Sequence, residues 1–329
     1  MAYTAIDNPE LYFQVKTYTG DGASTHAITL DGDEDMSPNL VWIKERSGNE
    51  NHSIFDTVRT ATKIMYPNLT NAEGTGTTTL KSFDSDGFSV GTDPGQNTSS
   101  DTYVAWCWKE SATAGFDINI HTGSGSSADI SHNLSAVPEM IFTKRRNDTQ
   151  EWFVYTSTTG SQKAVFLDAT SAVGTQASAY DAAPTSSVIN YGGDNGVNGS
   201  SDTYVAYLWR SVQGFSSMGS YIGNGNADGP FIYTGFRPAW VMFKKSSSTS
   251  SWWIGDSKRD VDNVVQQELY ADTSSAENTE SGGRVDFVSN GFKHRNSGGS
   301  GNTSGATYIY MAFAEAPFVN SNGVPCNAR

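Results

Sequence analysis

One segment occurs three times along this chain at intervals of about one hundred residues, and this repeat restricts the fold more than any other feature. The copies are residues 38–46, 138–146 and 238–246. Each begins with a proline, continues through a run rich in bulky apolar side chains and reaches a lysine. The pattern predicts a turn proline that leads into a buried strand ending at a cation.

A second repeat closes each copy of the pattern. Residues 99–109 read SSDTYVAWCWK, residues 200–210 read SSDTYVAYLWR, and a looser third copy occupies residues 305–313. Successive residues of a strand point to opposite faces, and both faces are apolar over residues 103–108. We therefore expect a central strand that is covered on both sides, either within a sandwich or by a neighbouring module.

The composition favours an all-β fold. Charged residues make up 17% of the chain, 33 residues are glycine, and the aromatic content of 12% is too high for a disordered chain. We predict three tandem β-sandwich modules, jelly-roll-like or lectin-like, of about 100 residues each. The predicted modules are residues 1–114, 115–213 and 214–329, the last with a C-terminal tail. Helix is expected only in the short segments 260–269 and 56–65.

Several classes of function are disfavoured by the sequence. The net charge of −14 argues against a nucleic-acid partner, and no apolar run reaches the roughly 20 residues of a membrane helix, so we expect no membrane insertion. The two cysteines do not suggest a disulfide framework. The five histidines lack zinc-site spacing, and we expect them at the surface. We predict no catalytic residue, no cofactor-binding residue and no cofactor.

One acidic run is a weak candidate for a metal site. Asp31, Asp33 and Asp35 alternate with other residues, as carboxylates do in calcium loops. Met36 and Trp42 stand where an EF-hand loop needs glycine and glutamate, so that motif is excluded. A calcium site of another kind remains one interpretation, and a solvated acidic turn is the favoured one.

An acid and a base keep the same spacing in the first and third modules. Asp56 precedes Arg59 by three residues, and Asp256 precedes Arg259 in the same way. A carboxylate acts as a catalytic acid or base only with a partner group and a pocket, and no second carboxylate stands at a matching place. We therefore expect a local ion pair that fixes the chain after a strand.

Adjacent aromatic residues form the third candidate site. Trp252 and Trp253 are neighbours, and Trp152 precedes Phe153 at the equivalent place. Neighbouring side chains on a strand point to opposite faces, so one member of each pair should lie in the core. The other could stack on a host glycan or contact another subunit, and the subunit contact is favoured.

Four segments resemble structural proteins of tailed bacteriophages, often from marine and cyanobacterial hosts. They are residues 40–44 (LVWIK), 54–59 (IFDTVR), 229–241 and 308–318, and with the TYVAW strand they form the repeated pattern of such modules. The resemblance runs from about residue 12 to residue 318. The middle module departs from it, because Thr156 and Thr159 replace the acid and the base.

The resemblance implies a non-enzymatic virion protein, assembled in the host cytoplasm. It would act as a fibre or tail-associated adhesin or as a capsid decoration, with other virion proteins as partners. We expect a homo-oligomer, because symmetric contacts and many copies multiply weak binding. One alternative is a β-sandwich that binds a host surface glycan. A third is a polysaccharide depolymerase, which would need two carboxylates in a groove.

Overall fold

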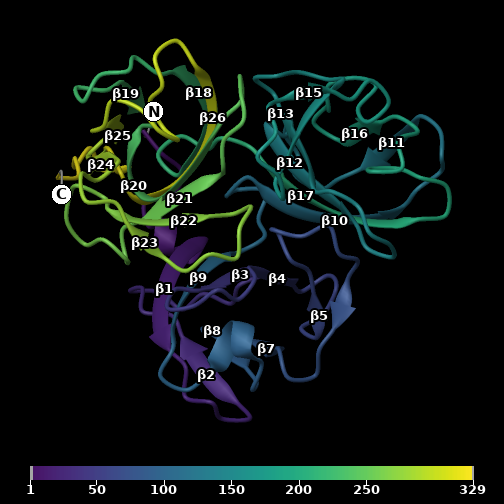
Figure 1. The fold of residues 1–329 in the computed structure, drawn as a ribbon, viewed down its shortest axis with the longest axis horizontal. Helices are drawn as coiled ribbons and strands as arrows, with labels where there is room; N and C mark the ends of the chain where they lie inside the picture. Colours follow the sequence, from purple (N-terminus) through teal and green to yellow (C-terminus); the bar gives the residue numbers. More distant parts are fainter. Residues whose placement is uncertain (1–2, 328–329) are drawn as a thin grey trace.

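The computed structural model describes residues 3–327, which form an all-β protein with three lobes around a common centre (Figure 1). The hydrogen-bonded sheets each fall within one of the three predicted modules. The described residues contain two short helices, the 3-10 helix η1 (Pro9–Leu11) and α1 (Pro94–Asn97). None of the helices in this part of the chain is long and apolar enough to cross a membrane.

Module 1 is a sandwich with one main sheet. The main sheet has the order β1-β9-β3-β4, formed by Phe13–Thr19, Thr102–Trp108, Leu40–Glu45 and Ser53–Asp56. The second sheet has the order β2-β8-β7, formed by His26–Thr29, Gly87–Val90 and Leu80–Asp84. A small pair consists of β5 (Lys63–Ile64) and β6 (Gly74–Thr75).

Modules 2 and 3 repeat this plan with longer main sheets. In module 2 the order is β10-β17-β12-β13-β14-β15, formed by Phe116–Thr122, Thr203–Trp209, Met140–Arg145, Phe153–Thr156, Lys163–Phe166 and Gly174–Thr175. Its second sheet pairs β11 (Ala128–Ser131) with β16 (Val188–Tyr191). In module 3 the order is β18-β26-β20-β21-β22-β23, formed by Ser216–Ile222, Thr307–Pro317, Phe236–Lys245, Trp253–Asp256, Gln267–Tyr270 and Asn278–Thr279. Its second sheet has the order β19-β25-β24, formed by Phe231–Tyr233, Gly291–His294 and Val285–Val288.

The closing strand of each module is central, as its two apolar faces predict. In module 1, β9 pairs with β1 on one side and with β3 on the other. One face of β9, which includes Tyr103 and Cys107, packs in a core shared with the second sheet of the same module. The other face, which includes Trp106 and Trp108, belongs to a core that extends into the other two modules. The main sheets of modules 1 and 2 therefore each separate a private core from the common one, whereas the core of module 3 is continuous with the common core.

Aromatic rings from all three modules meet in the common core. Trp108 of module 1 lies with its ring centroid 6.4 Å from that of Trp209 in module 2. The same ring lies 5.8 Å from Trp240 and 5.6 Å from Phe313, which belong to module 3. Burial of such rings is a major source of stability. The modules are thus packed on one another through their largest apolar side chains.

The two predicted helices are wrong. Residues 260–269 form bends that lead into β22, and residues 56–65 form turns that lead into β5. In both places the chain pairs with a neighbouring strand. Ile254 pairs with Leu269 in module 3, and Ile54 forms the equivalent bridge to Met65 in module 1. Long-range strand pairing overrides the weak local helical pattern.

Candidate functional site: the seams between modules

We call the three inter-module interfaces seam 1–2, seam 2–3 and seam 3–1. Several buried polar groups at repeat positions lie at these seams. At seam 1–2 the indole Nε1–H of Trp152 donates to the carbonyl oxygen of Tyr66 at 3.0 Å. At seam 2–3 the Nε1–H of Trp252 donates to the carbonyl oxygen of Phe166 at 2.8 Å. Both donors therefore reach the backbone of the preceding module from equivalent positions of the repeat.

Seam 3–1 closes the ring with a histidine in place of the tryptophan. The Nε2 atom of His52 lies 3.1 Å from the carbonyl oxygen of Tyr270. The indole N–H of Trp42 donates to Nδ1 of the same ring at 2.9 Å, so the proton of the neutral imidazole is on Nε2. Burial lowers the pKa of His52 well below its ordinary value, which keeps the ring neutral. Module 1 is thereby bonded to module 3 as module 2 is to module 1.

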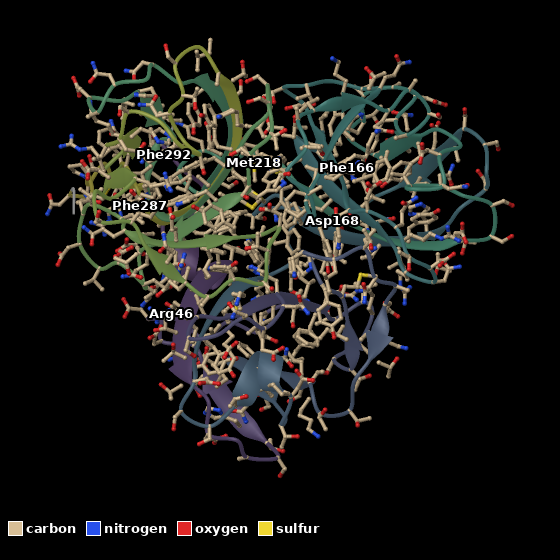
Figure 2. The ribbon with its side chains drawn as sticks, viewed as in Figure 1. Arg46, Phe166, Asp168, Met218, Phe287 and Phe292 are labelled. Atoms are coloured by element: carbon tan, nitrogen blue, oxygen red, sulfur yellow. The ribbon has the colours of Figure 1, made fainter. Side chains whose placement is uncertain are left out.

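Backbone hydrogen bonds repeat at the same three seams. The loop that follows β5, β14 or β22 donates one backbone N–H to a carbonyl oxygen of the next module in each case. The N···O distances are 2.8, 3.0 and 2.9 Å. The pairs are Glu73 to Arg146, Val173 to Ser246 and Glu277 to Arg46. Figure 2 labels Arg46 where modules 1 and 3 meet. The main chain thus makes the same cyclic connection whatever side chains stand at these positions.

The repeated lysine also lies at the seams. Lys44, Lys144 and Lys244 are fully buried, and Lys144 Nζ donates across seam 1–2 to the carbonyl oxygen of Thr70 at 2.7 Å. Burial lowers the pKa of each of these lysines to about 8. Lys244 Nζ lies 5.7 Å from the centre of the Trp252 ring. The predicted cation at the end of each buried strand is therefore a structural donor to backbone carbonyls.

Seam 1–2 contains a charged cluster around Arg59. The guanidinium donates through Nε to Asp56 at 2.5 Å, and both side chains have no exposed surface. Tyr207 of module 2 donates its hydroxyl to the same carboxylate at 2.6 Å. Glu73 accepts from Arg59 at 3.4 Å and from Arg146 of module 2 at 2.9 Å. The expected local ion pair is confirmed, and it is one part of a network that joins two modules.

The same cluster recurs at seam 3–1. Arg259 donates through Nε to Asp256 at 2.6 Å, and Trp106 of module 1 donates its indole N–H to that carboxylate at 3.0 Å. Glu277 accepts from Arg259 at 3.0 Å and from Arg46 of module 1 at 2.7 Å. Burial alone would lower the pKa of Arg259, but Asp256 and Glu277 raise it, so the guanidinium is charged.

Seam 2–3 lacks every member of this cluster. The five equivalent positions carry neutral side chains that cannot form it. They are Thr156, Thr159, Val173, Ser246 and Met311. Thr156 and Thr159 bond to each other through their hydroxyls at 3.0 Å. The acid, the base, the bridging glutamate, the second arginine and the aromatic donor have thus all changed together, as expected for groups that stabilise one another only as a set.

The acidic run of module 1 lies exposed at the protein surface. Asp31, Asp33 and Asp35 are all exposed. Asp31 pairs with Lys16 at 3.4 Å and with Lys258 of module 3 at 3.3 Å. Across residues 3–327 no three metal-binding side chains come together as a group. These contacts favour the solvated acidic turn over the calcium interpretation, because the three side chains are exposed and Asp31 pairs with two lysines.

The paired aromatic residues are all inside the protein. Trp152, Trp252 and Trp253 have no exposed surface, and the Trp253 indole donates to Glu268 at 3.0 Å within its own module. Stacking on a sugar and contact with another subunit both need an exposed ring face, and these three rings have none in the folded chain. Trp152 lies in the common core and Phe153 in the private core of module 2, whereas Trp252 and Trp253 both lie in the core that module 3 shares with the other modules.

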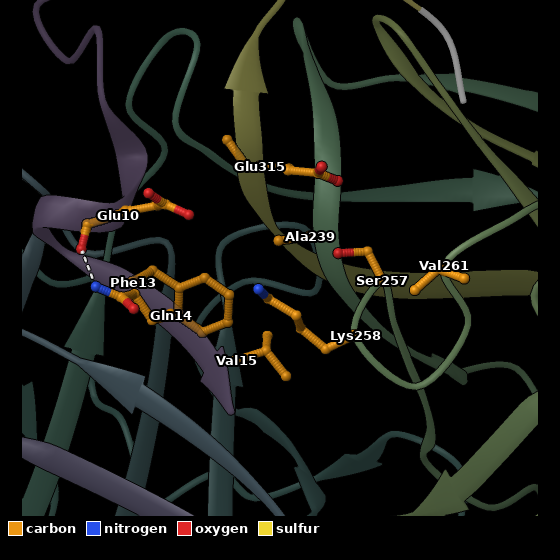
Figure 3. Close-up of a pocket in the computed structure, with 10 residues that line it drawn as sticks. Glu10, Phe13, Gln14, Val15, Ala239, Ser257, Lys258, Val261 and Glu315 are labelled. Atoms are coloured by element: carbon orange, nitrogen blue, oxygen red, sulfur yellow. Dashed lines mark hydrogen bonds between the residues drawn. The ribbon is translucent and has the colours of Figure 1, made fainter. Parts of the chain in front are cut away.

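A cavity of about 240 Å³ lies beside seam 3–1 (Figure 3). Phe13, Val15 and Ala239 form the apolar part of its lining, and Glu10 and Lys258 contribute charged groups. Sites for small ligands usually have volumes of about 300–1,000 Å³. The Lys258 ammonium already pairs with Asp31 of the acidic run. We therefore interpret this cavity as a packing gap between modules 1 and 3 and not as a ligand site.

The bridging glutamates Glu73 and Glu277 were not predicted from the sequence, although their spacing from the arginines offers one signal. Glu73 follows Arg59 by fourteen residues, and Glu277 follows Arg259 by eighteen, because module 3 carries four additional residues between them. Because of that insertion, Glu73 and Glu277 do not stand at the same distance from their arginines, and their equivalence is hidden in the sequence.

A family model described as a domain of unknown function (DUF7483) matches residues 8–317, which include most of all three modules. No curated protein matches the chain significantly.

Proposed function

The chain belongs to the DUF7483 family, and from this premise we propose that it is a non-enzymatic structural protein of a tailed-phage virion. It acts as a fibre or tail-associated adhesin or as a capsid decoration. Other virion proteins and further copies of the chain are its partners. The proposal rests on the resemblance of the repeats and on the use that the fold makes of its polar groups.

The observation that carries the proposal is the cyclic set of seam hydrogen bonds. Trp152, Trp252 and His52 each bond to the module before them, so the three modules form a closed ring within one chain. The buried carboxylates Asp56 and Asp256 are bonded to arginines and to aromatic donors of the next module. Groups that could serve acid–base chemistry are therefore engaged in joining modules, which supports a structural role.

The depolymerase alternative fits this arrangement poorly. A glycosidase needs two carboxylates about 5–10 Å apart in a groove that a sugar chain can enter. Asp56 and Asp256 have no exposed surface, and each is bonded at a different seam, Asp56 at seam 1–2 and Asp256 at seam 3–1. A polysaccharide would have to separate the modules to reach either one.

A second candidate function, glycan binding, is favoured by exposed aromatic side chains on module 3. Phe231 is 47% exposed and Tyr233 is 55% exposed, and both lie on β19 at the edge of its sheet. The hydroxyl of Tyr233 is 2.9 Å from that of Tyr3. An aromatic platform with a polar edge can stack on sugar rings. A glycan array probed with the protein and with the variant Phe231→Ala tests this candidate function. Binding that the variant loses would support it, and the absence of any bound glycan would exclude it.

The virion role is tested by a mass-spectrometric inventory of purified particles from a phage that carries this gene. We expect the chain in the particles at a fixed ratio to the major capsid protein, in multiple copies. Particles from a phage with the gene deleted should then lack one visible fibre, tail or surface feature in electron micrographs. Detection only in the lysate, with complete particles formed without the gene, would contradict the proposal.

A further inference from the structure

Seam 2–3 contains a cavity at the place where the other two seams hold their charged clusters. The cavity volume is about 400 Å³, and its wall includes side chains from the turn before β14, from β14, from the loop after it and from module 3. These residues are Thr159, Lys163, Val173, Ser246, Ser247 and Thr307. Three of them, Thr159, Val173 and Ser246, occupy the repeat positions of Arg59, Glu73 and Arg146 at seam 1–2.

The cavity has a simple origin in side-chain size. At seam 1–2 two guanidinium groups and a carboxylate fill the corresponding space and bond to one another. Threonine, valine and serine are shorter, while the backbone hydrogen bond from Val173 to Ser246 keeps the two modules at the same separation. The main chain therefore holds the space open although the side chains that would fill it have been replaced.

One cation remains in the cavity wall without its carboxylate. In module 1 the equivalent lysine, Lys63, lies 3.9 Å from Glu73 and donates to Thr75 at 2.8 Å. Lys163 keeps the ammonium, but Val173 replaces the glutamate. Within residues 3–327 Lys163 forms no ion pair, and its side chain is exposed. A ligand carboxylate could take the place that the glutamate has at seam 1–2.

Hydroxyl groups line the same cavity as this ammonium. Ser247 accepts a hydrogen bond from the backbone N–H of Thr307 at 3.1 Å, which leaves its own O–H to donate. Ser246 donates to the carbonyl oxygen of Thr307 at 3.1 Å, which leaves its lone pairs to accept. The side chain of Val173 adds an apolar surface. The wall thus offers one positive charge, hydroxyl donors and acceptors, and a small apolar face.

We propose that the seam 2–3 cavity binds a small carboxylated polyol of the uronic acid class. Its carboxylate pairs with Lys163, its hydroxyls bond to Ser246 and Ser247, and its ring lies against Val173. Because the site is open to solvent, binding is weak, with a dissociation constant on the order of 1 mM. This site goes beyond the proposed virion role and does not depend on it.

NMR titration of the full chain with D-glucuronate tests the proposal, with D-glucose as the neutral probe. Glucuronate should shift resonances of residues 158–163, 172–173 and 246–247, and glucose should bind about tenfold more weakly. Lys163→Ala should weaken glucuronate binding about tenfold. Val173→Glu, which restores the carboxylate of the other seams, should abolish it. Lys63→Ala is the matched control at seam 1–2 and should leave binding unchanged.

Each other outcome overturns the proposal. These outcomes are an absence of glucuronate shifts at seam 2–3, equal binding of glucose, and unchanged binding by Lys163→Ala. Equal weakening by Lys63→Ala would also show that the charge acts from a distance and not from the cavity. Thermal unfolding of each variant establishes that it is folded, and because Lys163 is exposed, its replacement should leave the melting temperature unchanged.

Discussion

The indole of Trp252 and the carbonyl group of Phe166 form a hydrogen bond of 2.8 Å across seam 2–3, although the residues are 86 positions apart. Trp152 and Tyr66 form the same bond at the same sequence separation. His52 and Tyr270 complete the set between the first and last modules. This cyclic relationship makes the chain one ring and not a string of three independent domains.

Replacing Trp252 by phenylalanine should destabilise the protein through this bond. The change removes the donor and leaves the partly buried carbonyl of Phe166 without it, which costs about 1–3 kcal/mol. The matched control is Trp209→Phe, because the Nε1–H of Trp209 has no partner among the described residues. Urea denaturation should show a larger loss for Trp252→Phe than for the control. Equal losses would mean that ring volume alone matters and that the hydrogen bond contributes nothing.

Replacing Asp256 by asparagine should cost more. The substitution keeps the size of the side chain but removes the charge that pairs with the buried guanidinium of Arg259. Removing one partner of a buried ion pair costs about 3–5 kcal/mol, and because Glu277 still pairs with Arg259 we expect a loss near the lower end of that range. Asp33→Asn serves as the control, because Asp33 is exposed, and it should change the free energy of unfolding by less than about 0.5 kcal/mol. A loss for Asp256→Asn as small as that of the control would refute the cluster's role.

The ion pairs and the central strands could be predicted from the sequence, and the seams could not. Asp56 and Arg59 are three residues apart, and the two apolar faces of β9 are visible in its residue pattern. The acceptor of Trp152 is a backbone carbonyl of another module, which no side-chain pattern reveals. His52 was expected at the surface, yet it is buried because module 3 covers it.

His294 should make stability depend on pH below its ordinary pKa. Burial lowers the pKa of His294 to about 3, and neither ring nitrogen has a partner in the described part of the chain. Because the folded state holds this proton less tightly than the unfolded state, the stabilisation is complete above about pH 6.5 and decreases as the pH falls toward 3. Tyr221, Phe243 and Phe292 surround the ring.

His294→Phe removes this titration and leaves the other groups in place. Between pH 7 and pH 5 the free energy of unfolding of the original protein should fall by about 2 kcal/mol more than that of the variant. Urea denaturation at the two pH values measures this difference. The same fall in both proteins would show that the ring does not titrate between the folded and unfolded states.

Differential scanning calorimetry of the full chain tests the central claim, which is that the seams and the common core unite three modules into one cooperative ring. We expect a single transition whose calorimetric and van't Hoff enthalpies agree, because a shared core couples the unfolding of all modules. We also expect Trp252→Phe, at seam 2–3 alone, to lower the midpoint of that whole transition. Two or three resolved transitions, only one of which moves in the variant, would contradict the claim.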